Sequence, residues 1–134
     1  MIFSETAKYA NVQPEDSVLG IQRLIQGAFP RGGTNFNAIF TTAKHKYDRI
    51  IILSDNQGWI GGGAPNESLQ KYRSQYGNPV IFSFDLVGYG TLMFPEAKVY
   101  CLAGFSEAVF EVMRLLEEGD REALVQSIST IRLR

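Results

Sequence analysis

Apolar residues form four compact runs along the chain. Three of them, residues 49–54, 80–84 and 98–103, are rich in β-branched or aromatic side chains and show no alternation with polar residues. Such runs are typical of strands that are buried on both faces, as in a parallel sheet. The fourth run, Met1 to Ser4, is short and predicts the tail of another strand.

Between and after these runs, apolar residues recur at the spacing of amphipathic helices. Helix starts are predicted at Pro14–Ser17, at Thr34 or Asn35, at Asn66, at Ser106 and at Asp120, where proline, acidic or capping side chains stand. Gly77 is expected to end the third helix. In chain order, the predicted apolar faces are Val18, Ile21, Leu24, Ile25 and Ala28; Phe36, Ile39, Phe40, Ala43 and Tyr47; Leu69, Tyr72 and Tyr76; Val109, Phe110, Met113 and Leu116; Ala123, Leu124 and Ile128.

The order of these elements is strand, helix, helix, strand, helix, strand, strand, helix, helix, with a short strand also considered at Thr91–Phe94. Alternation of buried strands and amphipathic helices predicts an α/β domain whose mostly parallel sheet is covered on both faces. A length of 134 residues fits one domain, residues 1–134. Ligands of such sheets bind beyond the carboxyl ends of the strands.

Composition narrows the function classes. The formal net charge is −1, from 13 basic and 14 acidic residues, so any contact with nucleic acid has to be local or come from another domain. Cys101 is the single cysteine, which excludes an internal disulfide and fits the cytoplasm. No signal peptide is recognisable, and the apolar runs are too short to cross a bilayer, so no membrane partner is expected.

Two segments place oxygen atoms at the predicted carboxyl edge of the sheet. Gly32-Gly33-Thr34-Asn35 is a glycine turn that presents a hydroxyl at a helix start, and Asp55 follows the strand that ends at Ser54. Oxygen ligands suit Mg²⁺, which usually keeps several waters. The alternative is structural: Thr34 caps its helix and Asp55 opens a turn.

These same segments resemble a known family. The turn Gly32–Asn35, then Tyr47-Asp48-Arg49, then Ile50–Asp55 is similar to the von Willebrand factor A fold. The stretches 83–90 and 102–106, together with Phe3-Ser4, resemble more specifically the A domain at the C-terminus of Ro/TROVE proteins. The resemblance implies a three-layer Rossmann-like fold.

The family's metal-ion-dependent adhesion site combines an Asp-x-Ser-x-Ser motif with a threonine and an aspartate. Thr34 and Asp55 match the last two elements, and the motif itself is absent, as are the strand and helix expected around it. The resemblance therefore implies a fold incomplete at its N-terminus and a weak Mg²⁺ site. Ser4, Asn35, Ser54 and Asn56 are its candidate neighbours.

The absent strand is central in the family, between the strands that hold Phe3 and Ile51. We expect another polypeptide to supply it, or self-association to cover the open edge; a rearranged sheet is the third possibility. The resemblance implies a non-enzymatic interaction module of a Ro-like ribonucleoprotein, in which RNA is bound through a partner or a separate domain. Lys44, Lys46 and Arg49 are candidate phosphate contacts; the alternative is a solvated helix end.

An enzyme is the competing interpretation. Gly61-Gly62-Gly63 resembles a dinucleotide loop, but Asn66 stands where a small residue is needed. Ser106, between a strand and a helix, resembles the nucleophile of a hydrolase, but its only candidate base is His45, the single histidine. An ordinary helix cap explains Ser106 equally well.

Overall fold

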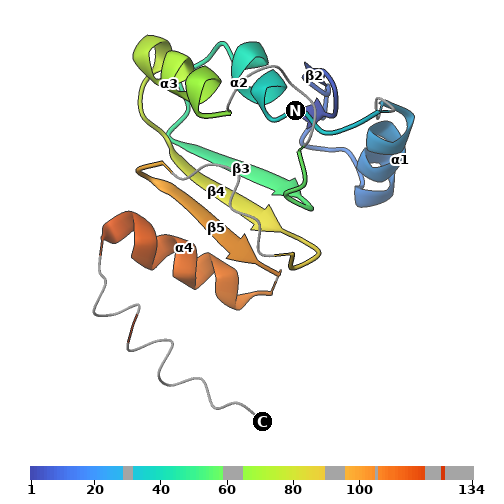
Figure 1. Ribbon diagram of the computed structural model, residues 1–134. Coiled ribbons are helices and arrows are strands. Elements are labelled where there is room, and N and C mark those ends of the chain that lie inside the picture. Colours follow the sequence, from blue (N-terminus) through green and yellow to red (C-terminus); the bar gives the residue numbers. More distant parts are fainter. Residues whose placement is uncertain (29–31, 59–64, 90–95, 105, 120–124, 126–134) are drawn as a thin grey trace.

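The computed structural model describes residues 1–28, 32–58, 65–89, 96–104, 106–119 and 125 (Figure 1). Its elements, in chain order, are β1 (Ile2–Phe3), β2 (Ala7–Lys8), α1 (Val18–Ala28), α2 (Asn37–Thr42), β3 (Arg49–Ser54), α3 (Pro65–Tyr76), β4 (Val80–Asp85), β5 (Val99–Ala103) and α4 (Ala108–Glu118). The predicted glycine loop 61–63, the strand at 91–94 and the helix from residue 120 lie outside the described residues.

Three strands form a parallel sheet in the order β3-β4-β5. The register pairs Ile51 with Phe82 and Leu53 with Phe84, so these four side chains share one face of the sheet. A separate two-stranded antiparallel ribbon joins β1 and β2, with Phe3 opposite Ala7. The prediction of an α/β fold with a parallel sheet is confirmed.

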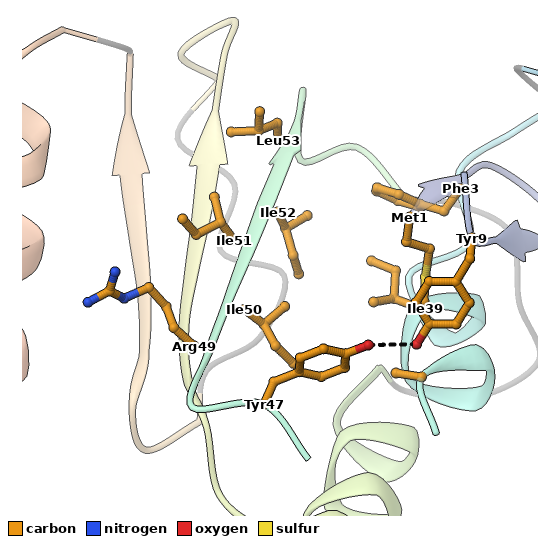
Figure 2. A pocket seen from close by; sticks show the side chains of 11 residues that line it. Met1, Phe3, Tyr9, Ile39, Tyr47, Arg49, Ile50, Ile51, Ile52 and Leu53 are labelled. Carbon is orange, nitrogen blue, oxygen red and sulfur yellow. Dashed lines mark hydrogen bonds between the residues drawn. The ribbon is translucent and has the colours of Figure 1, made fainter. Parts of the chain in front are cut away.

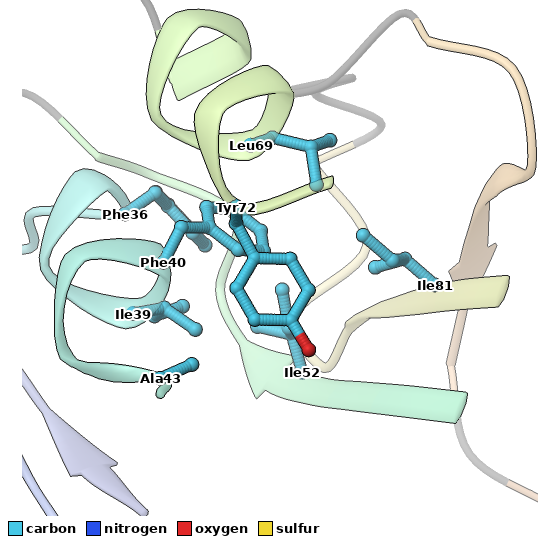
Figure 3. Close-up of a cluster of buried hydrophobic side chains, with 8 residues drawn as sticks. All are labelled: Phe36, Ile39, Phe40, Ala43, Ile52, Leu69, Tyr72 and Ile81. Atoms are coloured by element: carbon cyan, nitrogen blue, oxygen red, sulfur yellow. The ribbon is translucent and has the colours of Figure 1, made fainter. Parts of the chain in front are cut away.

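Helices α2 and α3 cover one face of the sheet. Figure 3 shows their side chains meeting those of β3 and β4 in a cluster made of Phe36, Ile39, Phe40, Ala43, Ile52, Leu69, Tyr72 and Ile81. This cluster confirms the apolar faces predicted for the second and third helices. The hydroxyl of Tyr72 donates a hydrogen bond of 2.7 Å to the carbonyl of His45, which ties α3 to the segment before β3.

Helix α4 lies on the opposite face of the sheet (Figure 1). Met113 packs there against Phe82 and Phe84, so the fold has three layers. Val109 and Leu116 join this contact, at spacings of four and three residues from Met113. Phe110, predicted on the buried face, is 59% exposed because it lies a quarter-turn away.

The two longest strands differ in how they are covered. Five of the six residues of β4 are buried, as predicted for a strand with helices on both sides. In β3, by contrast, burial alternates: Ile52 is 3% exposed, while Ile51 is 47% and Leu53 53% exposed. The prediction of a strand buried on both faces is therefore wrong for β3, because α4 packs on β4 and β5 and does not extend over it.

Two helix starts lie at the end of the segments predicted for them. α1 begins at Val18, later than Pro14, and the Ser17 hydroxyl accepts a hydrogen bond from the amide of Gly20. At α2, the capping oxygen belongs to Asn35, whose Oδ1 accepts a bond from the Asn37 amide. Local side-chain caps fix these ends, and an apolar pattern alone does not resolve them.

Two predicted caps are not used as expected. α3 begins at Pro65, so Asn66 lies inside the helix, where its Oδ1 is buried. α4 begins after Glu107, and no side-chain cap bond is formed there, so Ser106 precedes the helix without capping it through its side chain. Gly77, with φ of 120°, ends α3 as predicted.

Candidate partner-binding groove

A cavity of about 350 Å³ runs along the free edge of β3. Its walls are β3 on one side and the β1–β2 ribbon with α2 on the other (Figure 2). We call it the edge groove; it is lined by Met1, Phe3, Tyr9, Ile39, Ala43, Tyr47, Arg49, Ile50, Ile51, Ile52 and Leu53. Apart from two tyrosines and Arg49, these side chains are all apolar, so the groove is predominantly apolar.

The backbone of β3 shows which groups face the edge groove. The amide of Val80 donates to the carbonyl of Asp48, and the amide of Leu86 donates to the carbonyl of Ser54. Because successive residues of a strand direct their backbone groups to opposite edges, Ile50 and Ile52 also face β4. The N–H and C=O groups of Arg49, Ile51 and Leu53 then face the groove, and no backbone partner for them is found among the described residues.

A hydrogen bond between two tyrosines closes one end of the groove. The hydroxyl groups of Tyr9, which follows β2, and Tyr47, which precedes β3, are 2.9 Å apart. Figure 2 shows this bond near Ile50, toward the amino end of β3. The hydrogen bond with Tyr9 raises the pKa of Tyr47 to about 12. We call this pair the tyrosine clasp.

Arg49 is the only described lining residue with a charged side chain, and that charge is matched elsewhere. Its Nε donates to Oε1 of Glu117 on α4 at 2.6 Å, and its Nη2 donates to the other carboxylate oxygen. Glu117 raises the pKa of Arg49, and Arg49 lowers that of Glu117. No side chain of the described lining residues therefore offers an unmatched charge to a ligand.

The predicted cation ligands lie in two groups. Thr34 is half-buried beside Asn35, whose amide donates to the carbonyl of Ser4 at 2.8 Å, at the end of β1. Asp55 is exposed after β3, and its Oδ1 accepts bonds from the Gln57 amide and the Ser54 hydroxyl. No contact joins Thr34 to Asp55 in the described part of the chain.

These residues do not form a complete cation site by themselves. Two side-chain oxygens are far fewer than the six ligands of Mg²⁺, even though waters fill some of its positions. No cluster of three or more His, Cys, Asp or Glu residues suited to a metal occurs among the described residues. The Mg²⁺ site thus stays a prediction.

Asn56, a candidate neighbour of that site, has a structural role. It is fully buried with φ of 53°, and its Oδ1 accepts a bond of 2.7 Å from the Ser83 hydroxyl on β4. Its Nδ2 lies 3.3 Å from the sulfur of Cys101 on β5. Burial raises the pKa of the Cys101 thiol, which keeps it protonated. Asn56 thereby joins the carboxyl ends of three strands and fixes the turn that carries Asp55.

The three candidate phosphate contacts differ in whether they form an ion pair. Lys44 and Lys46 are exposed, as a solvated helix end would be, whereas Arg49 is engaged by Glu117. The phosphate contacts of these three residues stay a prediction.

The hydrolase pair is not assembled. His45 precedes β3 and its ring stands edge-on to those of Tyr9 and Tyr47. Ser106 follows β5 and lines a separate hollow of about 260 Å³ with Cys101. Because the strands are parallel, the two residues lie at opposite ends of the sheet, too far apart for proton transfer.

Sequence analysis did not find the tyrosine clasp or β2. A two-residue strand is too short to give a periodic signal, and Tyr9 and Tyr47 are 38 residues apart. Tyr47 was predicted on the apolar face of the second helix. It lies beyond α2 but packs against the hydrophobic cluster that α2 forms with the sheet.

Comparisons with known proteins point to one structure. No protein-family model and no curated protein matches the chain. The crystal structure of the Ro protein (RSR) of Deinococcus radiodurans is similar to it, with a TM-score of 0.63 and 20% sequence identity. The similarity covers 88% of this chain and 25% of that one, so the chain spans about a quarter of the length of its structural neighbour. At this identity the likeness shows a Ro-like fold.

None of the described helices combines the length and apolar character needed to cross a bilayer.

Proposed function

We propose that this chain is a non-enzymatic interaction module of a Ro-like RNA-binding protein, built on a von Willebrand factor A-like fold. The likeness to the Ro protein of Deinococcus radiodurans, over a quarter of that chain, supports a module that works with other parts. RNA would be bound through those other parts, because this chain has a net charge of −1 and only two exposed lysines in its predicted phosphate cluster.

The edge groove is the observation that carries this proposal. A free strand edge is a ready template for pairing with another segment, and native proteins normally cover it. Here the edge of β3 is accompanied by Ile51 and Leu53, which are about half exposed on the α4 face. A partner polypeptide that supplies a strand would cover both; a second copy of this chain is the other candidate.

The partial cation site fits the same proposal. Asp55 follows β3, and Thr34 precedes Asn35, whose amide bonds to Ser4 at the end of β1, so a partner strand between β3 and β1 would bring further oxygen ligands. Mg²⁺ would then bind to the assembled module more tightly than to this chain, because affinity follows the number and charge of the ligands.

Site-specific photocrosslinking tests the proposal. A photoreactive amino acid replaces Leu53 in the groove in one variant and Val87, which is similarly exposed but outside it, in the control. In the native host, position 53 is expected to give one defined adduct that position 87 lacks. An adduct of twice the mass of this 15.0 kDa chain would identify a second copy. Equal labelling at both positions would contradict the proposal.

A mobility-shift assay tests the RNA part separately. The purified chain is expected not to retard a single-stranded RNA at physiological salt, while the crosslinked or co-purified assembly does. Retardation by the chain alone, at similar concentrations, would show that RNA contact does not need a partner.

A further inference from the structure

We propose that the edge groove selects an uncharged, extended segment of its partner, which pairs with the backbone of Ile51 and Leu53, and that the tyrosine clasp excludes pairing at Arg49. This inference rests on the proposed function and specifies the partner chemistry and the register of the same site.

The backbone sets the mode of binding. With the even-numbered residues of β3 directed to β4, the free edge presents amide and carbonyl groups at every second residue. A segment that covered this edge through side chains alone would bury these groups without partners, at a cost of about 1–3 kcal/mol each. An extended backbone satisfies them in sequence, so strand addition is the mode that the edge favours.

Charge sets the composition of the segment. The groove walls are mostly apolar, and Arg49, the only charged side chain among the described lining residues, already forms a two-bond pair with Glu117. A lysine or glutamate carried into the groove would lose water and find no free charged side chain among the described residues that line it. The apolar walls therefore favour an uncharged occupant.

The two faces of the sheet set the side-chain pattern. One set of alternate side chains of the incoming segment would point toward Phe3, Ile39 and Ala43, on the side of α2. The other set would stand beside Ile51 and Leu53, on the face that α4 leaves bare. Apolar or β-branched residues at successive positions satisfy both faces.

The tyrosine clasp sets the limit of pairing. It joins the two walls at the amino end of β3, where the backbone of Arg49 faces the groove. A segment that reached Arg49 would have to displace the hydrogen bond of 2.9 Å between Tyr9 and Tyr47. With the clasp closed, pairing is confined to Ile51 and Leu53.

Amide hydrogen exchange of the full chain, followed by NMR, reads this register directly. In the free chain, the amides of Ile50 and Ile52 are expected to exchange slowly, and those of Ile51 and Leu53 quickly. The probe is a seven-residue peptide of alternating valine and threonine, acetylated and amidated. At saturation it is expected to slow exchange at Ile51 and Leu53 by about tenfold or more, with Arg49 unchanged.

Matched variants test separately the charge of the peptide, the groove residue Leu53 and the tyrosine clasp. A peptide with two valines replaced by lysine is expected to bind about tenfold or more weakly. Leu53→Lys is expected to reduce binding of the uncharged peptide, whereas Val87→Lys, at a position of similar exposure outside the groove, leaves it unchanged. Tyr9→Phe keeps the ring and removes the clasp bond, so slow exchange should then extend to the Arg49 amide.

Each outcome bears on one claim. If the crosslinked partner binds but Ile51 and Leu53 still exchange quickly, the interaction module stands and strand pairing is wrong. Equal binding of the charged peptide, or no binding of the uncharged one, overturns the composition claim. If the peptide slows exchange of the Arg49 amide in the unmodified chain, the claim that the tyrosine clasp limits pairing is wrong. Slow exchange at Ile50 and Ile52 in each variant verifies that the sheet is folded.

Discussion

Asn56 is the residue whose replacement should reveal how the turn carrying Asp55 is held. Its side chain is fully buried, accepts a bond from Ser83 and lies against the sulfur of Cys101. Its φ of 53° is in the left-handed region, which asparagine tolerates better than most residues. We expect Asn56→Ala to destabilise the fold through both features.

The expected loss of folding free energy in Asn56→Ala follows from the contacts of this residue. Removing the amide leaves the Ser83 hydroxyl, 2% exposed, without this acceptor, at about 1–3 kcal/mol. Placing alanine at a left-handed position adds about 1–2 kcal/mol. The expected total for Asn56→Ala is thus about 2–5 kcal/mol. Asn56→Gly loses the same hydrogen bonds but not the backbone term, so it should be milder by about 1 kcal/mol.

Urea unfolding followed by circular dichroism measures both differences. With a slope of about 2 kcal/mol per molar urea, a loss of 3 kcal/mol lowers the midpoint by about 1.5 M. The double variant Asn56→Ala with Ser83→Ala has no orphaned hydroxyl. Its loss of stability should therefore be smaller than the sum of the losses in the two single variants. Equal stabilities of the alanine and glycine variants would refute the backbone argument. Additive losses would refute the role of the Ser83 bond.

Two further predictions concern tyrosines. The raised pKa of Tyr47 means that the folded chain holds a proton between pH 10 and about 12 that the unfolded chain releases. This contribution to stability is present below pH 10 and is lost as the pH rises toward 12. In Tyr9→Phe, the absorbance titration of Tyr47 should move to lower pH. If it does not move, the bond with Tyr9 is not the cause of the raised pKa of Tyr47. Tyr72→Phe should cost about 1 kcal/mol in urea unfolding, because the bond to the His45 carbonyl is lost while the buried ring remains. Tyr76→Phe, on the same helix and less buried, is the control.

The layers of this fold could be predicted because long apolar patterns encode them. The run 49–54 gave β3 with its bounds, and the spacing of Phe36, Ile39 and Phe40 gave the face of α2 that packs on it. Both signals are dense and local. The capping residues were less predictable, since several neighbouring side chains were chemically suitable and tertiary contacts selected among them.

The candidate site was harder to predict from the sequence than the fold was. Thr34 and Asp55 are marked by their resemblance to a motif, but nothing in the sequence specifies that Asn56 turns inward to Ser83 and Cys101. Nor does it pair Tyr9 with Tyr47, since each is an ordinary surface tyrosine until the ribbon folds back beside β3. Contacts between distant short segments leave no periodic trace.

The disagreement between sequence and structure at β3 is itself evidence about function. An uninterrupted run of Ile50, Ile51, Ile52 and Leu53 is the pattern of a strand covered on both faces, yet alternate residues stand in solvent. In β4, where both faces are covered, the same kind of pattern is buried at five of six residues. A strand that only ever met water on one face would need no apolar residues there, and its exposed edge would favour aggregation. The sequence of β3 thus fits the proposed assembly, in which another segment would cover Ile51 and Leu53.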